Sequence, residues 1–507
     1  MNEHPPDVAV VAAPSTVKHL EVAPVALDYV TALESTAVVN VADRYELFID
    51  GQFVEPRSGK HFATINPATE AKLAMVAEAG AADIEAAVRA ARRAYDEIWR
   101  DMPGKQRAKY LYRIARVLQE RAREFAVLES LNGGKPIKES RDIDVPLAAA
   151  HFFYHAGWAD KLAYAFPGRS LRPLGVAAQV IPWNFPLLMA AWKIAPALAT
   201  GNTVVLKPAE TTPLTALLLA EVIQQADLPP GVVNIITGAG ATGAALVGHK
   251  GVDKVAFTGS TAVGKSIQRA VAGTGKKLTL ELGGKAANII FEDAAIDQAV
   301  EGIVNGIYFN QDHVCCAGSR LLVHEPVAEL VIDKLLRRID TLRVGDPLDK
   351  NTDIGAINSR AQLDKIESLV QSGRDEGATM YQSSCPLPAR GFFFPPTVFT
   401  GVSQSHRIAR EEIFGPVLSV LTFRTADEAV QKANNTPYGL SAGIWTEKGS
   451  RILWMAERMR AGVVWANTFN RFDPTSPFGG YKESGFGREG GRHGLASYAE
   501  LVDGGRR

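Results

Sequence analysis

Cysteine is scarce in this sequence. Among 507 residues there are three cysteines, Cys315, Cys316 and Cys385, and two of them are adjacent. This number and spacing exclude a disulfide framework and a conventional zinc site. A reducing compartment suits such a chain, so we expect a cytoplasmic protein that binds no metal.

Net charge and long apolar runs are also lacking. Lys and Arg together number 55, as do Asp and Glu, and there is no dense basic run that would indicate a nucleic-acid partner. No segment has the roughly 18–20 uninterrupted apolar residues of a membrane-spanning helix, and the N-terminus lacks the basic region of a signal peptide. We therefore expect a soluble protein, without a membrane partner, that acts on small molecules.

The hydrophobic residues are arranged as in α/β proteins. A chain of this length with 46% hydrophobic residues forms more than one core. Between residues 175 and 281 apolar strands alternate with amphipathic helices, and a second such stretch covers residues 286–480, which predicts parallel sheets. Tyr45–Pro56 predicts a hairpin around an Asp-Gly turn. Thr212 before Pro213 predicts a helix start capped by the threonine.

One GxGxxG pattern, from Gly238 to Gly243, lies between a predicted strand and a predicted helix. The dinucleotide fingerprint also needs an acid about 20 residues further on to bind the ribose, and no acid sits naturally there. We interpret this pattern as a helix entry with glycines.

A second group of residues suits a dinucleotide better. Lys207 and Glu210 follow a strand at the carboxyl edge of the predicted sheet, where ligands bind in open α/β folds. A carboxylate there accepts hydrogen bonds from both ribose hydroxyls and repels a 2′-phosphate, which favours NAD over NADP. The pyrophosphate would lie where Phe257 ends a strand, Gly259 permits close approach and Ser260 precedes a helix N-terminus. A solvated Lys–Glu pair is the alternative interpretation.

Four segments together carry more information than any one of them. They are PWNFP (Pro182–Pro186), LELGGK (Leu280–Lys285), VCCAGSR (Val314–Arg320) and EEIFGPV (Glu411–Val417). This set, followed by PFGGYKESGFGRE from residue 477, resembles the aldehyde dehydrogenase superfamily, and the resemblance runs from about Tyr45 to Tyr498. It implies an NAD-dependent enzyme with a Rossmann-like parallel-sheet cofactor domain, a second α/β catalytic domain and a small β element for oligomerisation.

The resemblance also implies catalytic roles. Cys315 matches the family's nucleophile, because a thiolate attacks a carbonyl readily and later leaves readily. The side-chain amide of Asn184 and the backbone N–H of Cys315 would stabilise the oxyanion. Glu281 matches the general base that activates water to hydrolyse the thioester. Lys193 and Glu489 match residues that relay protons from this base, although both would otherwise be taken for a surface pair.

Further positions are implied to bind the cofactor. Gly283 and Gly284 would let the nicotinamide approach closely, and Glu412 would hold its ribose beside Phe414. The full set of predicted cofactor contacts is Ile181, Trp183, Lys207, Glu210, Gly240, Phe257, Gly259, Ser260, Gly283, Glu412 and Phe414.

The expected domain boundaries follow the same resemblance. Residues 1–44 are rich in Ala, Val and Pro, and we predict a mobile extension there with one helix near residues 25–39. Residues 45–154 and 174–283 form the predicted NAD-binding domain and residues 284–482 the catalytic domain. Residues 155–173 and 483–507 form the oligomerisation element.

Two features depart from the family pattern. Most relatives carry Gly-Gln in a GQ-x-C pattern before the nucleophile, where this chain has Asp312 and His313. An imidazolium close to Cys315 would lower the pKa of its thiol, which gives the hypothesis that His313 alters the pH dependence of acylation. The second departure lies between Trp158 and Val176, which is about a dozen residues shorter than the usual oligomerisation hairpin. A homo-oligomer remains expected, either a dimer or the family's common tetramer.

The resemblance also places a substrate tunnel. Its predicted lining is apolar and aromatic and favours uncharged aliphatic or aromatic aldehydes: Phe185, Met189, Trp192, Phe309, Phe472 and Phe478. Arg471 could instead receive a carboxylate, which would make the substrate a semialdehyde. CoA-acylating dehydrogenation is a further alternative, but such relatives do not need the base Glu281. A non-catalytic family member is expected to lack Cys315, Asn184 or Glu281, and all three are present.

Overall fold

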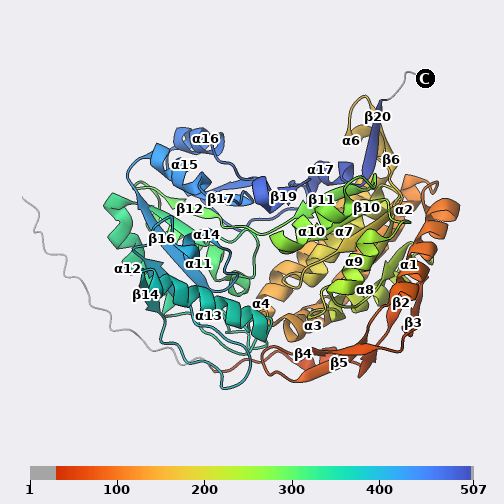
Figure 1. Cartoon of the computed structure of the whole chain (residues 1–507), viewed down its shortest axis with the longest axis horizontal. Helices are drawn as coiled ribbons and strands as arrows, with labels where there is room; N and C mark the ends of the chain where they lie inside the picture. Colours follow the sequence, from red (N-terminus) through yellow and green to blue (C-terminus); the bar gives the residue numbers. More distant parts are fainter. Residues whose placement is uncertain (1–29, 504–507) are drawn as a thin grey trace, which may run out of the picture. The chain divides into compact units, whose positions relative to one another are not determined.

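The protein is represented by a computed structural model, which describes residues 30–503 (Figure 1). Most of the predicted extension, and the last residues of the predicted oligomerisation element, lie outside the described residues. From Ala32 onward the chain belongs to one compact unit. Glu34 ties the start of this unit to its body, since its N–H donates to Leu348 O (2.8 Å) and its carboxylate pairs with Arg123 and Lys350. In the described part of residues 25–39 the helix is a short 3₁₀ turn, Thr36–Val38.

An eight-stranded sheet forms the first half of this unit, with strand order β19-β11-β10-β7-β8-β9-β2-β3. Five of its strands are parallel and come from the predicted βα repeats: β7 (Val176–Val180), β8 (Thr203–Lys207), β9 (Val233–Ile235), β10 (Lys254–Thr258) and β11 (Lys277–Glu281). Almost every residue of these strands is buried, as expected for a parallel sheet covered on both faces. The predicted α/β class with parallel sheets is confirmed.

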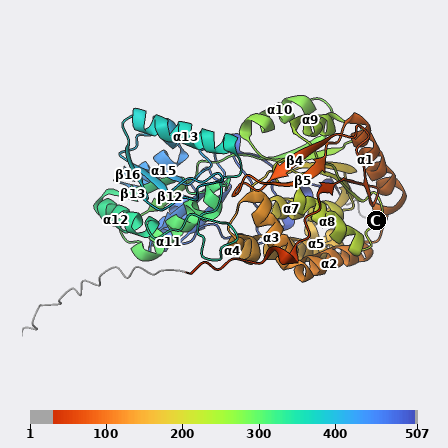
Figure 2. The ribbon, with the colours of Figure 1, turned by 90° about the horizontal axis from the view of Figure 1, so that it is seen from below.

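Helices cover both faces of this sheet (Figure 2). One face carries α2 (Gly104–Glu120), α5 (Val145–Ala159), α7 (Pro186–Ala199) and α8 (Leu214–Gln225), and the other carries α1 (Ala81–Ala94), α9 (Gly240–Gly248) and α10 (Thr261–Val271). All residues of α7 are buried, because this helix is apolar on nearly its whole circumference. The motif PWNFP leads directly into α7, so its position is fixed by the core.

The predicted start of α8 is wrong in its detail. The N-cap is Pro213 rather than Thr212, and the Thr212 hydroxyl has no hydrogen-bond partner among the described residues. The side chain of Asn132, at the end of α3 (Ala122–Gly133), accepts from Leu214 N instead (3.2 Å). A residue distant in sequence therefore provides the cap that local sequence assigned to its neighbour.

The predicted N-terminal hairpin is confirmed. Strands β2 (Leu47–Ile49) and β3 (Gln52–Val54) pair in antiparallel fashion, and β2 joins the end of the large sheet by pairing with β9. Asp50 and Gly51 between them have φ of 55° and 77°. Two successive positive φ values are what a two-residue hairpin turn requires.

A seven-stranded sheet forms the second half. Its order is β14 (Thr379–Gln382), β15 (Thr397–Thr400), β16 (Val417–Phe423), β13 (Arg320–His324), β12 (Ala287–Ile290), β17 (Ser441–Trp445) and β18 (Val463–Ala466). All neighbours except β14 and β15 are parallel. Its helices include α11 (Ile296–Ile307), α12 (Ala328–Ile339), α13 (Arg360–Asp375), α15 (Ala426–Asn434) and α16 (Gly449–Ala456).

Two small sheets complete the unit. Strands β1 (Arg44–Tyr45), β5 (Lys72–Ala77) and β4 (His61–Ile65) form one of them. The other pairs β6 (Arg169–Pro173) with β20 (Ala499–Asp503), which stand at the periphery near α6 (Leu162–Ala165) and α17 (Gly491–Ala496) (Figure 1). The shortened segment before Val176 thus contributes a single strand to this sheet. Within residues 30–503, no helix has the length and apolar composition needed to cross a bilayer.

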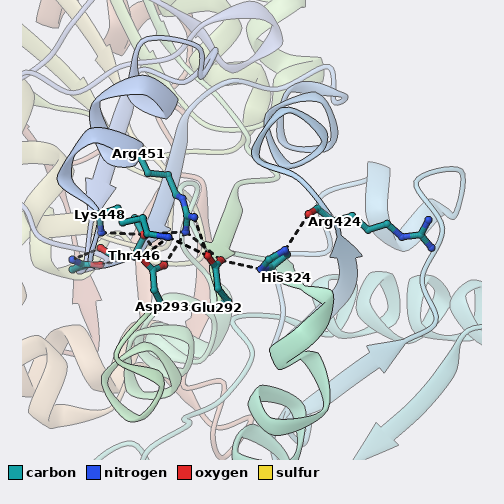
Figure 3. Close-up of polar contacts among 8 residues, drawn as sticks. Glu292, Asp293, His324, Arg424, Thr446, Lys448 and Arg451 are labelled. Carbon is teal, nitrogen blue, oxygen red and sulfur yellow. Dashed lines mark hydrogen bonds and ion pairs between the residues drawn. The ribbon is translucent and has the colours of Figure 1, made fainter.

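A network of polar side chains connects the carboxyl ends of β12, β13 and β17 in the second sheet (Figure 3). Glu292 and Asp293, which follow β12, receive the guanidinium of Arg451 from α16 at 2.9 and 2.8 Å. His324 at the end of β13 lies 2.9 Å from the Glu292 carboxylate. Thr446 after β17 donates to Asp293 (2.8 Å). Three neighbouring strands are therefore joined at one edge by charged side chains.

We expect Glu292→Gln to lower the free energy of unfolding at pH 7 by about 1 kcal/mol, a value reduced for the partial exposure of this carboxylate. The hydrogen bond to Arg451 lowers the pKa of Glu292 from 4.5 to about 2. The stabilisation is therefore complete above pH 4.5 and lost as the pH falls toward 2. Urea unfolding at pH 7 and pH 3 should show a smaller difference between variant and wild type at the lower pH.

The exposed acid Glu447 lies beside the same network and offers a matched control. Glu447→Gln should leave the unfolding free energy unchanged at both pH values. A Glu292→Gln difference that does not vary with pH would contradict an origin in the carboxylate's charge.

Candidate active site

The predicted catalytic residues meet where the two large sheets face each other end to end. Asn184 follows β7 and Glu281 is the last residue of β11, so both lie at the carboxyl edge of the first sheet. Cys315 precedes β13 and Glu412 precedes β16, so both lie at the amino edge of the second sheet. The site is therefore assembled from both halves of the unit.

A left-handed turn presents Cys315. Asn310, Gln311 and Asp312, in a short 3₁₀ segment, have φ of 49°, 56° and 60°, a conformation that is costly for residues with a Cβ. Buried hydrogen bonds hold it: Asn310 N donates to the Glu139 carboxylate (2.9 Å), and the Gln311 amide donates to Ala356 O (3.0 Å) and accepts from Gly355 N (3.1 Å). The nucleophile thus follows a turn that its surroundings determine.

The thiol of Cys315 is partly accessible, whereas that of Cys316 is buried. A hydrogen bond with Cys316, together with burial, raises the pKa of the Cys315 thiol well above its usual value. The Cys316 sulfur lies 3.8 Å from Asn470 Oδ1. Of the two adjacent cysteines, Cys315 is the one placed to react.

Asn184 lies against the nucleophile loop. Its side-chain nitrogen donates to His313 O (2.7 Å), and its own carbonyl accepts from the amide of Asn310 (3.0 Å). An amide nitrogen carries two N–H donors and this bond uses one of them. The other suits an oxyanion formed at Cys315.

Glu281 is buried in an environment that disfavours its charge. Among the described residues neither of its carboxylate oxygens has a hydrogen-bond partner. Burial raises the pKa of Glu281 well above its usual value, the Glu489 carboxylate raises it further and Lys193 opposes the shift. Lys193 and Glu489 form a fully buried ion pair rather than the surface pair of the alternative interpretation. A carboxyl group with a raised pKa is suited to proton transfer.

Two cavities meet at the reacting groups. The first, of about 60 Å³, is lined by the six predicted apolar substrate contacts but not by Arg471: Phe185, Met189, Trp192, Phe309, Phe472 and Phe478. The second, of about 130 Å³, contains Trp183, Gly259, Ser260, Gly283, Glu412 and Phe414 from the predicted cofactor set. Both are lined by Asn184, Thr258, Glu281 and Cys315. A substrate in one cavity and a cofactor in the other would therefore touch the same four residues.

The second cavity fits the reactive end of a dinucleotide. Gly284 N donates to the Glu412 carboxylate (2.9 Å), which fixes this acid at the cavity wall. A Cβ at Gly283 would lie 2.4 Å from Glu412 Oε2, and one at Gly284 would lie 2.2 Å from Cys315 O. The clash at Gly284 is with backbone, so only glycine fits there, whereas a side chain at Gly283 would displace the Glu412 carboxylate. The backbone of Gly283 forms part of the cavity wall. Ser260 caps α10, whose first N–H groups can receive a phosphate.

The remaining predicted cofactor residues lie along the first sheet. Lys207 ends β8 and is buried, and its ammonium lies 3.3 Å from the half-exposed Glu210 carboxylate. Gly240 begins α9 and is exposed, whereas the side chains of Ile181 and Phe257 are buried. A Cβ at Gly259 would lie 2.6 Å from the Phe257 ring. Lys207, Glu210, Ile181 and Phe257 are not among the residues that line the second cavity.

Two sequence hypotheses find no support in the geometry. The His313 ring packs against Trp183 and Phe414, and burial lowers the pKa of His313 to about 3, so no imidazolium faces Cys315. Arg471 is exposed, and the substrate cavity is lined by its neighbours Asn470 and Phe472.

Sequence reasoning missed several lining residues. In the cofactor cavity they are Gln362 and Lys365 of α13, and in the substrate cavity they include Ile143, Leu147, Asn305 and Asn470. Ile143 and Leu147 are spaced i, i+4, which places them on one helix face and is a usable signal. The residues of α13 carry no comparable signal, because only the tertiary fold brings them to the site.

Comparisons with known proteins identify the family of this chain. The chain matches the Aldehyde dehydrogenase family over residues 53–502. It is 46% identical over 468 residues to Retinal dehydrogenase 2 of Homo sapiens, a match that covers 90% of each chain. It is 44% identical over 482 residues to Benzaldehyde dehydrogenase, mitochondrial, of Antirrhinum majus, covering 93% of this chain and 90% of that one.

A solved structure agrees equally well. The NAD+ complex structure of aldehyde dehydrogenase from Bacillus cereus superposes with a TM-score of 0.88 at 43% identity, covering 91% of this chain and 96% of that chain. These matches confirm the resemblance that the four motifs indicated, and the chain belongs to the aldehyde dehydrogenase family.

Proposed function

We propose that this enzyme uses NAD to oxidise an aldehyde to a carboxylic acid through a thioester on Cys315, with Glu281 as the base for hydrolysis. The observation that carries the proposal is the junction of the two cavities at Asn184, Thr258, Glu281 and Cys315. One cavity is apolar and suits an aldehyde side chain, whereas the other is lined by glycine, serine and glutamate.

In the first step the Cys315 thiol gives its proton to water, and the resulting thiolate sulfur forms a bond to the carbonyl carbon. The carbonyl oxygen becomes an oxyanion, and the free N–H of the Asn184 amide and the N–H of Cys315 are placed to stabilise it. Removing one such donor typically slows an enzyme about 10²–10³-fold. The resulting thiohemiacetal holds the carbon's hydrogen ready for transfer.

The second cavity would hold NAD through Glu412 at the nicotinamide ribose and Ser260 at the pyrophosphate, and Lys207 and Glu210, outside that cavity, would hold the adenosine ribose. When bound, NAD supplies the oxidant, taking up hydride from the thiohemiacetal carbon. The wall formed by Gly283 and Phe414 would orient it. The oxyanion collapses as the hydride leaves, and Cys315 then carries a thioester.

Glu281 completes the reaction. Its carboxylate takes a proton from water, the oxygen of that water bonds to the thioester carbon, and the carbon–sulfur bond breaks to release Cys315 as a thiolate. The products are the carboxylic acid and the free enzyme. The charges of the buried Lys193–Glu489 pair act on Glu281, since both residues alter the pKa of its carboxyl group. We propose that this pair carries the proton away.

The proposed substrate is an uncharged aliphatic or aromatic aldehyde. The rings of Trp192 and Phe478 lie 5.4 Å apart, those of Phe472 and Phe478 5.7 Å, and they form one apolar wall. A carboxylate on the substrate would have no cation on this wall, because Arg471 is exposed outside it. This argues against a semialdehyde.

Assembly and location are part of the proposal. The two-stranded pairing of β6 and β20 at the periphery supports a homo-oligomer, which we expect to be a dimer or a tetramer of 54.5 kDa chains. Sedimentation velocity distinguishes these masses, and a monomer would contradict this part. The three free cysteines support a reducing, cytoplasmic location.

Glu281→Gln should reduce steady-state turnover by roughly 10²–10⁴-fold, because the amide cannot accept the proton of water. Rapid-quench kinetics should still show about one equivalent of reduced nicotinamide per chain in the first turnover.

In the wild type, turnover should increase as the pH rises above neutral, since Cys315 and Glu281 both have raised pKa values and both act in their deprotonated forms.

Glu301→Gln, on the exposed surface of α11, is the matched control and should keep full activity. Wild-type turnover in Glu281→Gln would exclude the proposed base. Release of an acyl-CoA instead of the acid when CoA is supplied would exclude hydrolysis. A pH profile that is the same in Glu489→Gln as in the wild type would remove the proposed proton path.

Glu210→Gln should raise the ratio of kcat/KM for NADP to that for NAD about tenfold, because the amide no longer repels a 2′-phosphate. Initial rates with each cofactor at saturating aldehyde give this ratio. Glu221→Gln removes another partly exposed acid, at α8, and should leave the ratio unchanged. The absence of any change in Glu210→Gln would show that this carboxylate does not select the cofactor.

A further inference from the structure

The unusual pair Asp312 and His313 connects two loops that the proposed mechanism treats separately. One is the nucleophile loop, residues 309–316, and the other is the cofactor loop, residues 411–417, which carries Glu412 and Phe414. Asp312 and His313 are 3% and 1% exposed. Buried polar residues at these positions need a physical reason, because burying a polar side chain is costly.

Asp312 contacts the cofactor loop directly. Its Oδ2 accepts a hydrogen bond from Gly415 N (3.2 Å). Gly415 packs closely against α13, since a Cβ there would lie 2.3 Å from Ile366 Cδ1. Gln362 of the same helix donates to Ile413 O (3.0 Å) and Phe414 O (2.9 Å). The cofactor loop is thus held between α13 and Asp312.

Asp312 also interacts electrostatically with Lys285. The Asp312 Oδ1 atom and the Lys285 ammonium are both buried without a hydrogen-bond partner among the described residues. Each stabilises the charge of the other: Lys285 opposes the rise that burial causes in the pKa of Asp312, and Asp312 opposes the fall that burial causes in the pKa of Lys285. Lys285 directly follows Gly283 and Gly284 in the sequence. The attraction between Asp312 and Lys285 therefore also links the nucleophile loop to the glycine segment of the cofactor cavity.

His313 makes the second link through its ring. It lies edge-to-face with Trp183 at 4.7 Å and stacks on Phe414 at 5.7 Å, and Trp183 and Phe414 themselves are 5.3 Å apart. Trp183 and Phe414 both line the cofactor cavity. The three rings come from the loops before α7, β13 and β16. His313 therefore acts as a flat neutral ring between two cofactor contacts.

We propose that Asp312 and His313 are positioning residues that couple cofactor binding to the placement of Cys315. When the cofactor contacts Glu412 and Phe414, it restricts the motion of the cofactor loop. The Gly415–Asp312 hydrogen bond and the packing of the three rings then restrict the motion of the nucleophile loop as well. The coupling is reciprocal, so a well-placed nucleophile loop also strengthens cofactor binding. The inference rests on the proposed function, since it assumes that NAD binds this cavity.

The test uses NAD itself and the purified full-length enzyme. The affinity for NAD is measured by calorimetry. The rate of Cys315 alkylation by iodoacetamide is measured with and without saturating NAD, and the modified residue is located by tandem mass spectrometry. In the wild type NAD should change the alkylation rate at Cys315 several-fold, which requires no aldehyde and no turnover.

Asp312→Gly should weaken NAD binding about tenfold, because the buried Gly415 N–H loses its acceptor. It should also remove most of the NAD-dependent change in alkylation. Its melting temperature should be equal to or higher than that of the wild type, because glycine adopts a φ of 60° without strain. If Asp312 only stabilised the fold, its replacement would not weaken NAD binding without also lowering the melting temperature.

Asp312→Asn keeps an oxygen that can accept from Gly415 N and should restore NAD binding to within about threefold of the wild type. His313→Gln should weaken NAD binding about threefold through the lost ring contacts. Glu301→Gln, on the exposed surface of α11, is the control. It contacts neither the nucleophile loop nor the cofactor loop, so it should leave NAD affinity unchanged.

Wild-type NAD affinity in Asp312→Gly, or an alkylation rate that NAD does not alter in the wild type, would overturn the coupling. The coupling would also be overturned if Asp312→Gly bound NAD more weakly only because its melting temperature had fallen. Failure of the proposed function looks different, because then the wild type itself would neither bind NAD nor oxidise any aldehyde.

Discussion

The left-handed turn at Asn310–Asp312 is the constraint on which the active site depends. Three successive residues with Cβ atoms at positive φ cost of order 1–3 kcal/mol each, and such a turn persists only where its surroundings determine it. Here Glu139, Gln311 and Asp312 supply the buried hydrogen bonds that do so. The turn brings the chain from α11 to the amino end of β13, and Cys315 is thereby held opposite Glu281 and Asn184 on the other sheet.

Burial sets the chemical state of every reacting group around this turn. It raises the pKa of Glu281, contributes to the raised pKa of Cys315 and lowers the pKa of His313. A neutral histidine cannot activate the thiol as a cation, so its value to the site lies in packing. The same low dielectric that disfavours isolated charges strengthens the interactions of the Lys193–Glu489 pair and of Asp312 with Lys285. Proton transfer and loop placement thus share one physical origin.

Much of this could be predicted from the sequence, for reasons that are local. Apolar runs predict the parallel strands, and the turn residues predict the Asp50–Gly51 hairpin. Four motifs, by their order and length, indicate the family, because so many matches are not expected by chance. Contacts that depend on tertiary structure could not be predicted. Asn132 rather than Thr212 caps α8, Gln362 and Lys365 reach the cofactor cavity from a distant helix, and His313 turns toward Trp183 rather than Cys315. In each case the deciding partner is remote in the chain.

The claim that Cys315 carries the substrate can be tested directly by trapping the covalent intermediate. Enzyme mixed with NAD and a benzaldehyde-like substrate is quenched with acid within the first turnover, digested at low pH and analysed by tandem mass spectrometry. The account predicts an acyl group, bound as a thioester, on the sulfur of Cys315. Product formation with the acyl group on Cys316 or Cys385, or with no acylated cysteine in any quenched sample, would contradict it.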